Sequence, residues 1–423
     1  MLIKIFNNNN FELNKEILFL FSLYISLLIG FYFGENSTGG AILDYNNQKI
    51  ISAKFLLNFK ETFYNFDNFS TRHSPILIIF LSFLEYIFSS DMLIRFIYLH
   101  ICLILPFLFF KVLCLKFNNV DKNILLLLSG LIFLSPTFRS LSIWPDSRII
   151  GLTIFLLSIY YFVKFEIELN FKYAILNILT CSFSAYLSPN FSVFSLFFLF
   201  KFINVYGLIT PKIFLIYFLN LILAIPALYY IFILDINFLN KTAAINIDSN
   251  ERIFFNNIFN DILITFSITF FYLIPFLIVK LINIKKVLGI KNIIFSLLIF
   301  SISAFFFNYQ YKYSGGGVFF KISNQLFNNN LFFYFISLFS ILIILPFLRS
   351  KKENLFLFLL ILINNPQYTI YHKYFDPFLL ISFFSLFNFK ISLQKKKSKN
   401  LILIYVYFLI FLIISNLKFL WTS

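Results

Sequence analysis

Apolar residues follow one another in long runs along this chain, and short clusters of Asn, Lys, Ser and Pro separate one run from the next. The runs are about 15 to 23 residues long, and a run such as Phe191 to Phe200 is apolar on every side. About 20 apolar residues are needed for a helix to cross the hydrocarbon of a bilayer, whereas a transmembrane strand alternates in polarity over about ten residues. The pattern therefore predicts an all-α fold, a polytopic bundle of transmembrane helices.

The candidate spans cover residues 17–33, 93–115, 124–138, 148–163, 173–187, 192–209, 212–234, 262–282, 293–307, 331–348, 355–363, 377–393 and 400–417. The first run, Ile17 to Phe33, has no small-x-small cleavage site after it, so we expect it to be retained as a helix. The stretch from Pro75 to Ser90 is interrupted by Glu85 and would make a helix of only about 24 Å. We expect this stretch to be a short, buried or incomplete segment on the outer side, which gives about 13 spans, or about 14 if it crosses.

Basic residues orient the predicted helices. They gather in alternate loops, around Lys116, Lys164 to Lys172, Lys201 to Lys212, Lys286, Arg349 to Lys352 and Lys396. Cytoplasmic loops carry the excess of Lys and Arg in membrane proteins, so these loops are predicted to be cytoplasmic. Residues 34–74, 139–147, 235–261, 308–330 and 364–376 then form the extracytoplasmic loops. The first is the longest, and apolar residues at helical spacing from Ala53 to Phe69 predict a helix on the membrane surface within it.

The composition agrees with a membrane protein and excludes other classes. Of the 423 residues, 60% are hydrophobic and 12% are charged, whereas about 25% of a soluble domain is charged. The formal charge of +16 is spread between apolar runs rather than gathered in a basic domain, so we expect no nucleic-acid partner. Cys102, Cys114 and Cys181 lie in apolar runs, at spacings typical of neither a metal site nor a disulfide framework. No repeat or linker divides the chain, so residues 1–423 are predicted to form one transmembrane domain.

Several short motifs follow one another in order on the predicted outer side. They are Asp44 to Lys54 in the first loop, His73-Ser74-Pro75-Ile76, Arg95-Phe96, Trp144-Pro145-Asp146 and Lys373-Tyr374-Phe375-Asp376-Pro377. In this order they resemble the GT-C superfamily of glycosyltransferases that use polyprenyl-phosphate sugars, particularly its protein mannosyltransferase and aminoarabinose transferase branch. The chain departs from the usual motifs where Tyr45, Ser74 and Lys373 replace an acid, a proline and an arginine.

The resemblance implies an enzyme that moves a sugar from a polyprenyl-phosphate donor to a lipid, glycan or protein acceptor. It would lie among the lipids of a bacterial inner (plasma) membrane, with its active site facing the periplasm or exterior. In inverting transfer, a carboxylate accepts the proton of the acceptor as the acceptor oxygen attacks the anomeric carbon. Asp44 stands where the family has its acidic residue, although most loop carboxylates are merely solvated. Glu35, in the polar turn after the first run, is the rival candidate for the catalytic base.

The leaving phosphate requires nearby cations that neutralise its developing charge. Lys373, Arg72 and His372 are the candidates for this role, and an interfacial residue that reaches lipid headgroups is an equal alternative for each. His73 is a further candidate for acceptor or phosphate binding, and Tyr374 belongs to the same late motif as Lys373. These residues form the predicted substrate-binding and phosphate-binding set together with Asp146.

Asp146 follows a proline in a short outer loop and is flanked by Arg139 and Arg148. A structural ion pair is as good an explanation of this carboxylate as a contact with substrate or metal. Neither outer loop contains an Asp-x-Asp pair, and hard cations usually need several oxygen ligands gathered together. We therefore predict no metal ligands and no certain cofactor, although a divalent cation is compatible with the sequence.

Two other functions remain open at this point. A secondary transporter or lipid-linked saccharide flippase would need ionisable residues near the middle of the membrane and internal symmetry, and Glu85 is the one carboxylate placed with assurance inside an apolar segment. An O-antigen polymerase or ligase would share the lipid-linked substrate, but it usually relies on Arg and His residues of outer loops. The acids of this chain gather in the predicted outer loops, which favours the transferase.

Overall fold

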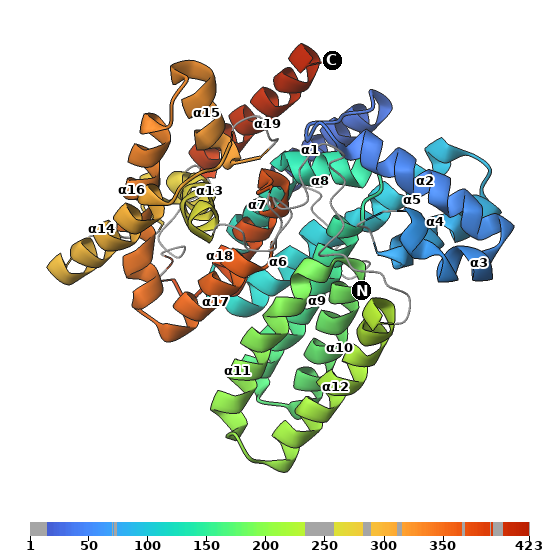
Figure 1. Ribbon diagram of the computed structural model, residues 1–423, viewed down its shortest axis with the longest axis horizontal. Helices are drawn as coiled ribbons and strands as arrows, with labels where there is room; N and C mark the ends of the chain where they lie inside the picture. The colour runs from blue at the N-terminus through green and yellow to red at the C-terminus, as the bar shows by residue number, and fades with distance from the viewer. Residues whose placement is uncertain are drawn as a thin grey trace, which may run out of the picture.

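The computed structural model describes residues 15–69, 71, 74–232, 258–281, 289–310, 315–365, 369–389, 391 and 401–422 (Figure 1). The first α-helices are α1 (Lys15–Tyr32), α2 (Ala41–Leu57), α3 (Phe59–Tyr64), α4 (Pro75–Ile87), α5 (Asp91–Cys102), α6 (Ile104–Lys116), α7 (Lys122–Gly130), α8 (Pro136–Ile143), α9 (Ser147–Glu168) and α10 (Phe171–Leu187). They are followed by α11 (Ser195–Tyr206), α12 (Pro211–Phe232), α13 (Ile258–Ile278), α14 (Ile290–Phe305), α15 (Gly317–Phe327), α16 (Leu331–Arg349), α17 (Lys352–Ile363), α18 (Phe378–Ser385) and α19 (Ile402–Thr422). Short 3₁₀ helices are η2 (Phe66–Phe69), η3 (Leu131–Leu134), η4 (Pro189–Phe194) and η6 (His372–Tyr374). The predicted all-α class is confirmed.

Seven stretches of helix in the described part of the chain are long and apolar enough to cross a membrane. They are Lys15–Tyr32, Asp91–Lys116, Ser147–Glu168, Pro189–Tyr206, Pro211–Phe232, Ile258–Ile278 and Leu331–Arg349. Lys122–Leu134 and Pro136–Ile143 pass the same test as a pair and are bent by 64° at their junction. These helices support an integral membrane protein. Seven spans, or eight with the bent pair, are fewer in the described residues than the 13 or 14 that the sequence predicted, because several predicted spans fall on short or broken helices.

Some predicted spans are helices too short to cross lipid alone. Helix α17 has 12 residues and α18 has 8, so they extend about 18 and 12 Å. All eight residues of α18 are buried. Because protein surrounds α18, its ends do not need to reach the membrane surfaces, and an irregular backbone is tolerated beside it.

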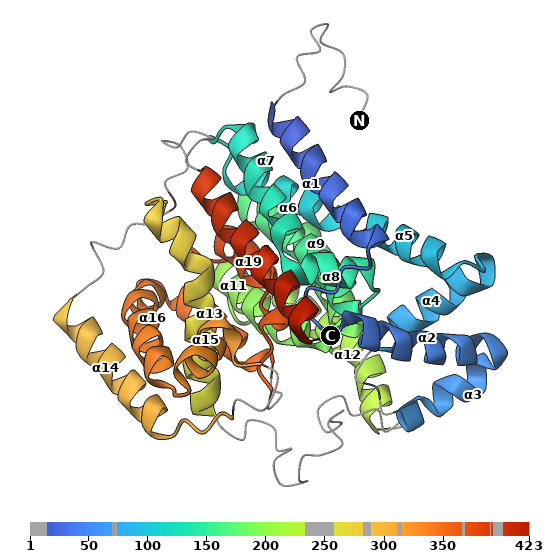
Figure 2. The same cartoon turned by 90° about the horizontal axis from the view of Figure 1, so that it is seen from above.

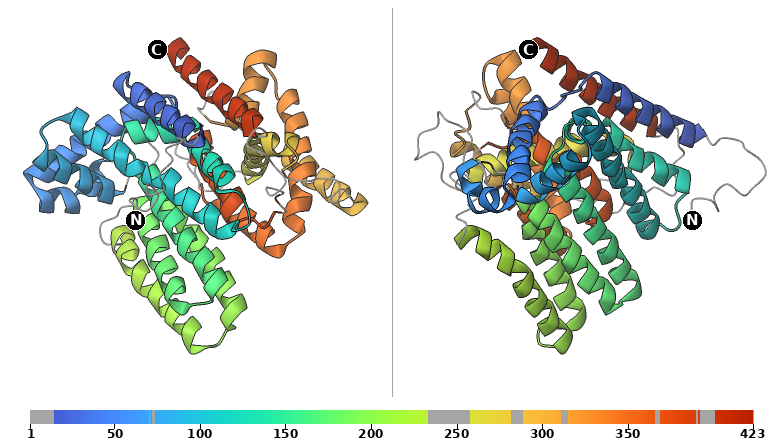
Figure 3. Two further views of the ribbon diagram at one scale, coloured as in Figure 1. Left: turned by 180° about the vertical axis from the view of Figure 1, so that it is seen from behind. Right: turned by 90° about the vertical axis from the view of Figure 1, so that its right-hand side faces the viewer.

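The helices form three neighbouring groups when the molecule is seen from above (Figure 2). Helices α13 to α16 lie on one side, α2 to α5 lie on the other, and α1, α6 to α9 and α19 lie between them. Helices α9 to α12 run side by side, and Figure 3 shows from two further directions that they extend away from the remainder of the molecule.

The first outer segment is mostly helical, which corrects the predicted boundaries. The expected surface helix begins at Ala41 rather than Ala53, and it breaks at Asn58, whose side chain accepts a hydrogen bond from the Glu61 N–H and so starts α3. Asp44 therefore lies in the first turn of a helix and not in a loop. Helix α2 buries one stripe of residues against the protein and leaves apolar side chains such as Leu57 exposed, as an interfacial helix does.

The stretch between Pro75 and Ser90 does not form a full span. Helix α4 has 13 residues, about 20 Å, against a hydrocarbon core of about 30 Å. It packs on α2, where the Ser52 hydroxyl donates a hydrogen bond of 3.1 Å to Glu85 Oε2. The carboxylate that interrupts the apolar segment thus joins two helices of the first outer segment.

Charged residues of the predicted cytoplasmic loops meet at one end of the bundle. Lys201 Nζ lies 2.9 Å from Glu166 and 3.1 Å from Glu353, and Lys116 Nζ donates a 2.8 Å hydrogen bond to the Ser385 carbonyl. Helix α9 has 22 residues and is therefore about 33 Å long. Its C-terminal part, with Glu166, lies at this end of the bundle, and its N-terminus, which follows Asp146, lies at the other end. The two ends of the bundle therefore carry different predicted loops, and the membrane side that each end faces remains a prediction.

Cysteine labelling tests this orientation. We predict that a cysteine at the exposed position 60 reacts with a membrane-impermeant maleimide in intact cells, and that cysteines at the exposed positions 172 and 352 react only after permeabilisation. The unaltered chain, whose cysteines lie within helices, gives the baseline. Labelling at position 172 but not at position 60 in intact cells would show that the orientation is the opposite of the predicted one.

Candidate active site

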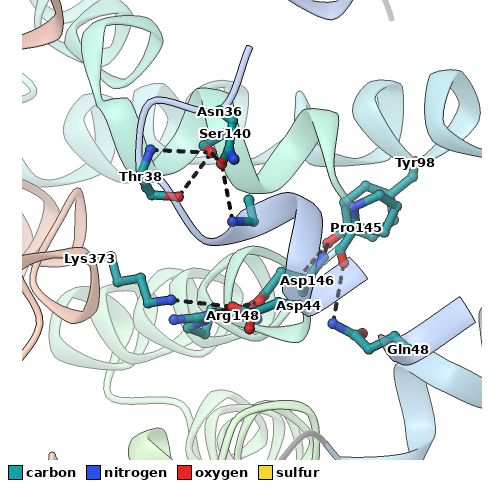
Figure 4. A network of polar contacts seen from close by, with 11 residues as sticks. Asn36, Thr38, Asp44, Gln48, Tyr98, Ser140, Pro145, Asp146, Arg148 and Lys373 are labelled. Atoms are coloured by element: carbon teal, nitrogen blue, oxygen red, sulfur yellow. Dashed lines mark hydrogen bonds and ion pairs between the residues drawn. The ribbon is translucent and has the colours of Figure 1, made fainter. Parts of the chain in front are cut away.

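Four charged side chains from three distant parts of the chain meet at one end of the bundle (Figure 4). Asp44 comes from the first turn of α2, Arg148 from the first turn of α9, and Lys373 from η6. Asp146 is the N-cap of α9, where its Oδ1 accepts the Arg148 N–H at 2.9 Å. The predicted site residues Asp44, Asp146 and Lys373 therefore lie together, although their roles are not tested by this geometry.

Arg148 stands at the centre of this charged cluster, which consists of Asp44, Asp146, Arg148 and Lys373. Its Nε and Nη2 lie 2.8 and 2.6 Å from the two carboxylate oxygens of Asp146, which is the bidentate geometry of a strong ion pair. Nη2 also lies 3.1 Å from Asp44 Oδ2, and Lys373 Nζ lies 3.3 Å from the same oxygen. One carboxylate oxygen of Asp44 therefore faces two cations.

The four side chains differ in their exposure to solvent. Asp146 exposes 1% of its side chain, Arg148 15%, Lys373 16% and Asp44 32%. Arg148 Nη1 is buried and has no hydrogen-bond partner among the described residues. Asp44 is therefore the member of the charged cluster that a molecule from outside reaches most easily.

The acidic loop before α9 is held by neighbouring helices. The Tyr98 hydroxyl donates to the Asp146 carbonyl at 2.5 Å and accepts the Asp146 N–H at 3.1 Å. The Arg95 guanidinium lies 3.5 Å from the centre of the Trp144 ring, and its Nε donates to the Ile143 carbonyl at 3.0 Å. These contacts fix the backbone of the loop, so the Asp146 side chain has a defined direction.

The polar turn after α1 attaches α2 to α8. Ser37 donates a 2.8 Å hydrogen bond to the Pro136 carbonyl, and the hydroxyls of Thr38 and Ser140 lie 3.0 Å apart. Asn36 Oδ1 accepts the N–H of Ala41, the first residue of α2. The turn thus fixes where α2 begins, and Asp44 follows one turn later.

Glu35 lies in a second buried ion pair. Arg139 Nη2 is 2.6 Å from Glu35 Oε2, Arg139 Nε is 2.9 Å from both carboxylate oxygens, and the side chains are 6% and 8% exposed. Asn416 Nδ2 adds a 3.2 Å hydrogen bond to Oε1. A Cβ at Gly30 would collide with Glu35 Oε2 and Arg139 Nη2, so a larger residue there would displace the ion pair. Arg139 belongs to α8, which occupies much of the predicted loop 139–147.

The late motif places its residues in different environments. His372 Nε2 lies 2.9 Å from the Tyr272 hydroxyl, and its ring packs against Phe271. Burial, and next the charge of Lys321, lower the pKa of His372 to about 3, so the imidazole is neutral at physiological pH. The ring of Tyr374 lies 5.3 Å from the Arg148 guanidinium. Tyr374 therefore borders the charged cluster, whereas His372 attaches η6 to Tyr272 of α13.

Arg72 and His73 lie outside the described residues, so the structure does not place them. The described residues contain no group of three or more His, Cys, Asp or Glu side chains arranged to hold a metal ion. Two carboxylates do meet in the charged cluster, but Arg148 occupies the space between them. A divalent cation is therefore still only an expectation.

The sequence did not predict two contributions to the site. Arg148 is a neighbour of Asp146 in the chain, but its contact with Asp44 depends on the fold. Asp376 belongs to the late motif, and its carboxylate is buried against α8, where no role was expected for it. The sequence signal that could have singled out Asp376 is a carboxylate directly before a proline at the start of an apolar run.

No family model, curated protein or solved structure matches this chain. The family resemblance therefore remains an expectation, and the site itself carries the functional argument.

Proposed function

We propose that this protein is a membrane glycosyltransferase that moves a sugar from a polyprenyl-phosphate donor to an extracytoplasmic acceptor with inversion at the anomeric carbon. One observation carries the proposal. A partly exposed carboxylate, Asp44, and a cation 329 residues later in the chain, Lys373, meet at one end of a bundle of apolar helices. Transfer from a lipid phosphate requires a base and a cation within one site at the membrane boundary.

Each residue of the charged cluster has a proposed role. Asp44 is the general base, which takes the proton of the acceptor hydroxyl while the acceptor oxygen bonds to the anomeric carbon. The bond between that carbon and the phosphate oxygen breaks, and the polyprenyl phosphate leaves with its electron pair. Lys373 neutralises the phosphate, which competes with Asp44 for the ammonium group. Arg148 is held by Asp146 and so keeps its guanidinium beside Asp44.

Glu35 is assigned a different role from that of Asp44. Both of its oxygens accept hydrogen bonds from Arg139, and the pair is nearly inaccessible to solvent. A base must reach its proton directly or through one water molecule, and the contacts of Glu35 leave little room for either. Glu35 therefore holds α1 and α8 together in this proposal.

The position of the charges also favours transfer over transport. Asp44, Asp146 and Lys373 lie at the beginnings of α2 and α9 and in η6, rather than in the middle of long helices. A transporter carries its substrate through ionisable groups near the middle of the membrane. Charges at one end suit a reaction at the membrane surface.

Mass spectrometry of lipids and surface glycans tests the proposal. We expect deletion of the gene to cause accumulation of one polyprenyl-phosphate sugar and the loss of that sugar from a surface glycan, lipid or protein. A plasmid carrying the natural chain should restore both, and a plasmid carrying Asp44→Asn should restore neither. An unchanged pool of lipid-linked sugars and unchanged surface sugars in the deletion strain would contradict a transferase.

A further inference from the structure

Asp376, three residues after Lys373, is buried against the beginning of α8. Its Oδ2 accepts a 2.6 Å hydrogen bond from the Ser135 hydroxyl and a 3.0 Å hydrogen bond from the Thr137 N–H. A buried carboxylate is costly unless such donors satisfy it. These two bonds join the segment that carries Lys373 to α8, a helix of the central group.

The beginning of α8 does not depend on Asp376 for its cap. Ser135 is the N-cap of this helix, and its hydroxyl accepts the Phe138 N–H at 2.9 Å. Asp376 is an additional acceptor from a remote part of the chain, 241 residues away from Ser135. Its contacts therefore connect two segments instead of merely completing one helix end.

The segment around Lys373 has further attachments. The Tyr272 hydroxyl lies 2.9 Å from His372 Nε2, and the Asp376 carboxylate is a close neighbour of the same tyrosine. The Gly316 N–H donates to the Ile370 carbonyl at 2.9 Å. The residues on either side of Lys373 are thus fixed, and the backbone of Lys373 is fixed with them.

Helix α8 connects this attachment to the acidic loop. It has eight residues, about 12 Å, and it ends at Ile143, directly before Trp144-Pro145-Asp146. Asp376 holds the N-terminus of α8. Asp146, which pairs with Arg148, follows shortly after the C-terminus of the same helix. A shift of one end moves the cation Lys373 relative to Arg148 and Asp44.

We propose that Asp376 is a positioning residue, which sets the place of Lys373 relative to Asp44 and Arg148 through its bonds to the start of α8. The inference rests on the proposed function, because Lys373 is assigned there to the donor phosphate. Asp376 does not touch substrate. Its removal displaces Lys373 toward solvent and weakens the binding of the donor.

The pKa of Lys373 reports this displacement. Burial, and next the charge of Arg148, lower this pKa below its usual value, whereas Asp44 and Asp146 oppose the shift. The Tyr371 ring, 5.1 Å from Nζ, is a further neighbour of the ammonium group. An ammonium group with a lowered pKa loses its proton at a lower pH, so movement of Lys373 into water raises its pKa. The alkaline limb of kcat/KM then moves to higher pH.

The experiment measures KM and the pH profile with the lipid-linked sugar purified from the deletion strain. We expect Asp376→Ala to raise KM for this donor by about 5- to 150-fold, the effect of about 1 to 3 kcal/mol, and to move the alkaline limb upward. Asp376→Asn keeps an oxygen for Ser135 and Thr137, so it should stay close to the natural chain. Asp121→Ala is the matched control, because it removes the N-cap of α7 and should change neither quantity.

Tyr272→Phe decides the matter if Asp376→Ala does not fold. It keeps the ring and removes the hydroxyl that contacts His372 beside Asp376, so we expect smaller changes in the same directions. Unchanged KM and an unchanged alkaline limb in folded Asp376→Ala, or in Tyr272→Phe if Asp376→Ala does not fold, would overturn the positioning role. If the natural chain transfers no sugar from the purified lipid, the proposed function fails instead, and the two failures are distinguished by the activity of the natural chain.

Discussion

Asp44→Asn is expected to lower the rate of sugar transfer by about 10² to 10⁴ while the protein still inserts and folds. The amide has the size of the carboxylate and can accept hydrogen bonds from Arg148 and Lys373, but it cannot take the proton of the acceptor. Asp44 is one-third exposed, so its replacement should change stability little. The measurement is the initial rate of transfer by purified protein, normalised to the amount that elutes as a folded species.

Asp91→Asn is the matched control for this loss. Asp91 also contacts α2, through the Tyr45 hydroxyl at 2.8 Å and Lys49 Nζ at 2.7 Å, but it lies outside the charged cluster. We expect its rate to remain within a few-fold of the natural value, because exposed ion pairs contribute about 0 to 1 kcal/mol. A normal rate in Asp44→Asn would show that Asp44 is not the base.

Glu35→Gln is expected to have the largest effect on stability, a loss of about 3 to 5 kcal/mol of unfolding free energy. The change leaves the Arg139 charge buried without its carboxylate partner, at a junction of α1, α8 and α19. We expect transfer per folded molecule to stay close to the natural value. Thermal unfolding in detergent, followed by size-exclusion chromatography, measures the loss, and the transfer assay is run on the folded peak.

The double variant Glu35→Gln with Arg139→Gln is the control for the ion pair. It leaves no unpaired charge in the interior, so it should recover part of the lost stability. A stable but inactive Glu35→Gln, together with an active Asp44→Asn, would place the catalytic base at Glu35, nine residues before the proposed position. If Glu35 is the base instead of Asp44, Glu35→Gln is therefore the variant that loses activity, and Asp44→Asn is the variant that keeps it.

The order of apolar runs was sufficient to predict a bundle of apolar helices and to assign Asp44, Asp146 and Lys373 to one end of it, but not to predict which helices are long enough to cross a membrane. That prediction needs only alternate loops and the length of a span, both of which are local properties. The pairing of charges needs more. Arg139 and Arg148 both flank Asp146, and only the path of α8 turns the first toward Glu35 and the second toward Asp44.

Local signals also explain the misplaced boundaries. The start of α8 has a capping serine followed by Pro136, which is a recognisable helix start, but the preceding apolar run suggested one span that ended near there. The start of α2 has no side-chain cap of its own and depends on the turn that packs on α8. The sequence around Asp44 therefore contains no strong helix start, and the predicted surface helix began too late.

The proposed base belongs to a helix with two different supports. On one side, protein contacts hold α2, such as Tyr45 with Asp91 and Ser52 with Glu85. On the other side, exposed apolar side chains such as Leu43 and Leu57 face away from the protein and suit the boundary between lipid and water. A detergent micelle replaces that flat boundary with a curved one. The depth of Asp44, and with it the rate of transfer, is therefore a joint property of the protein and its bilayer.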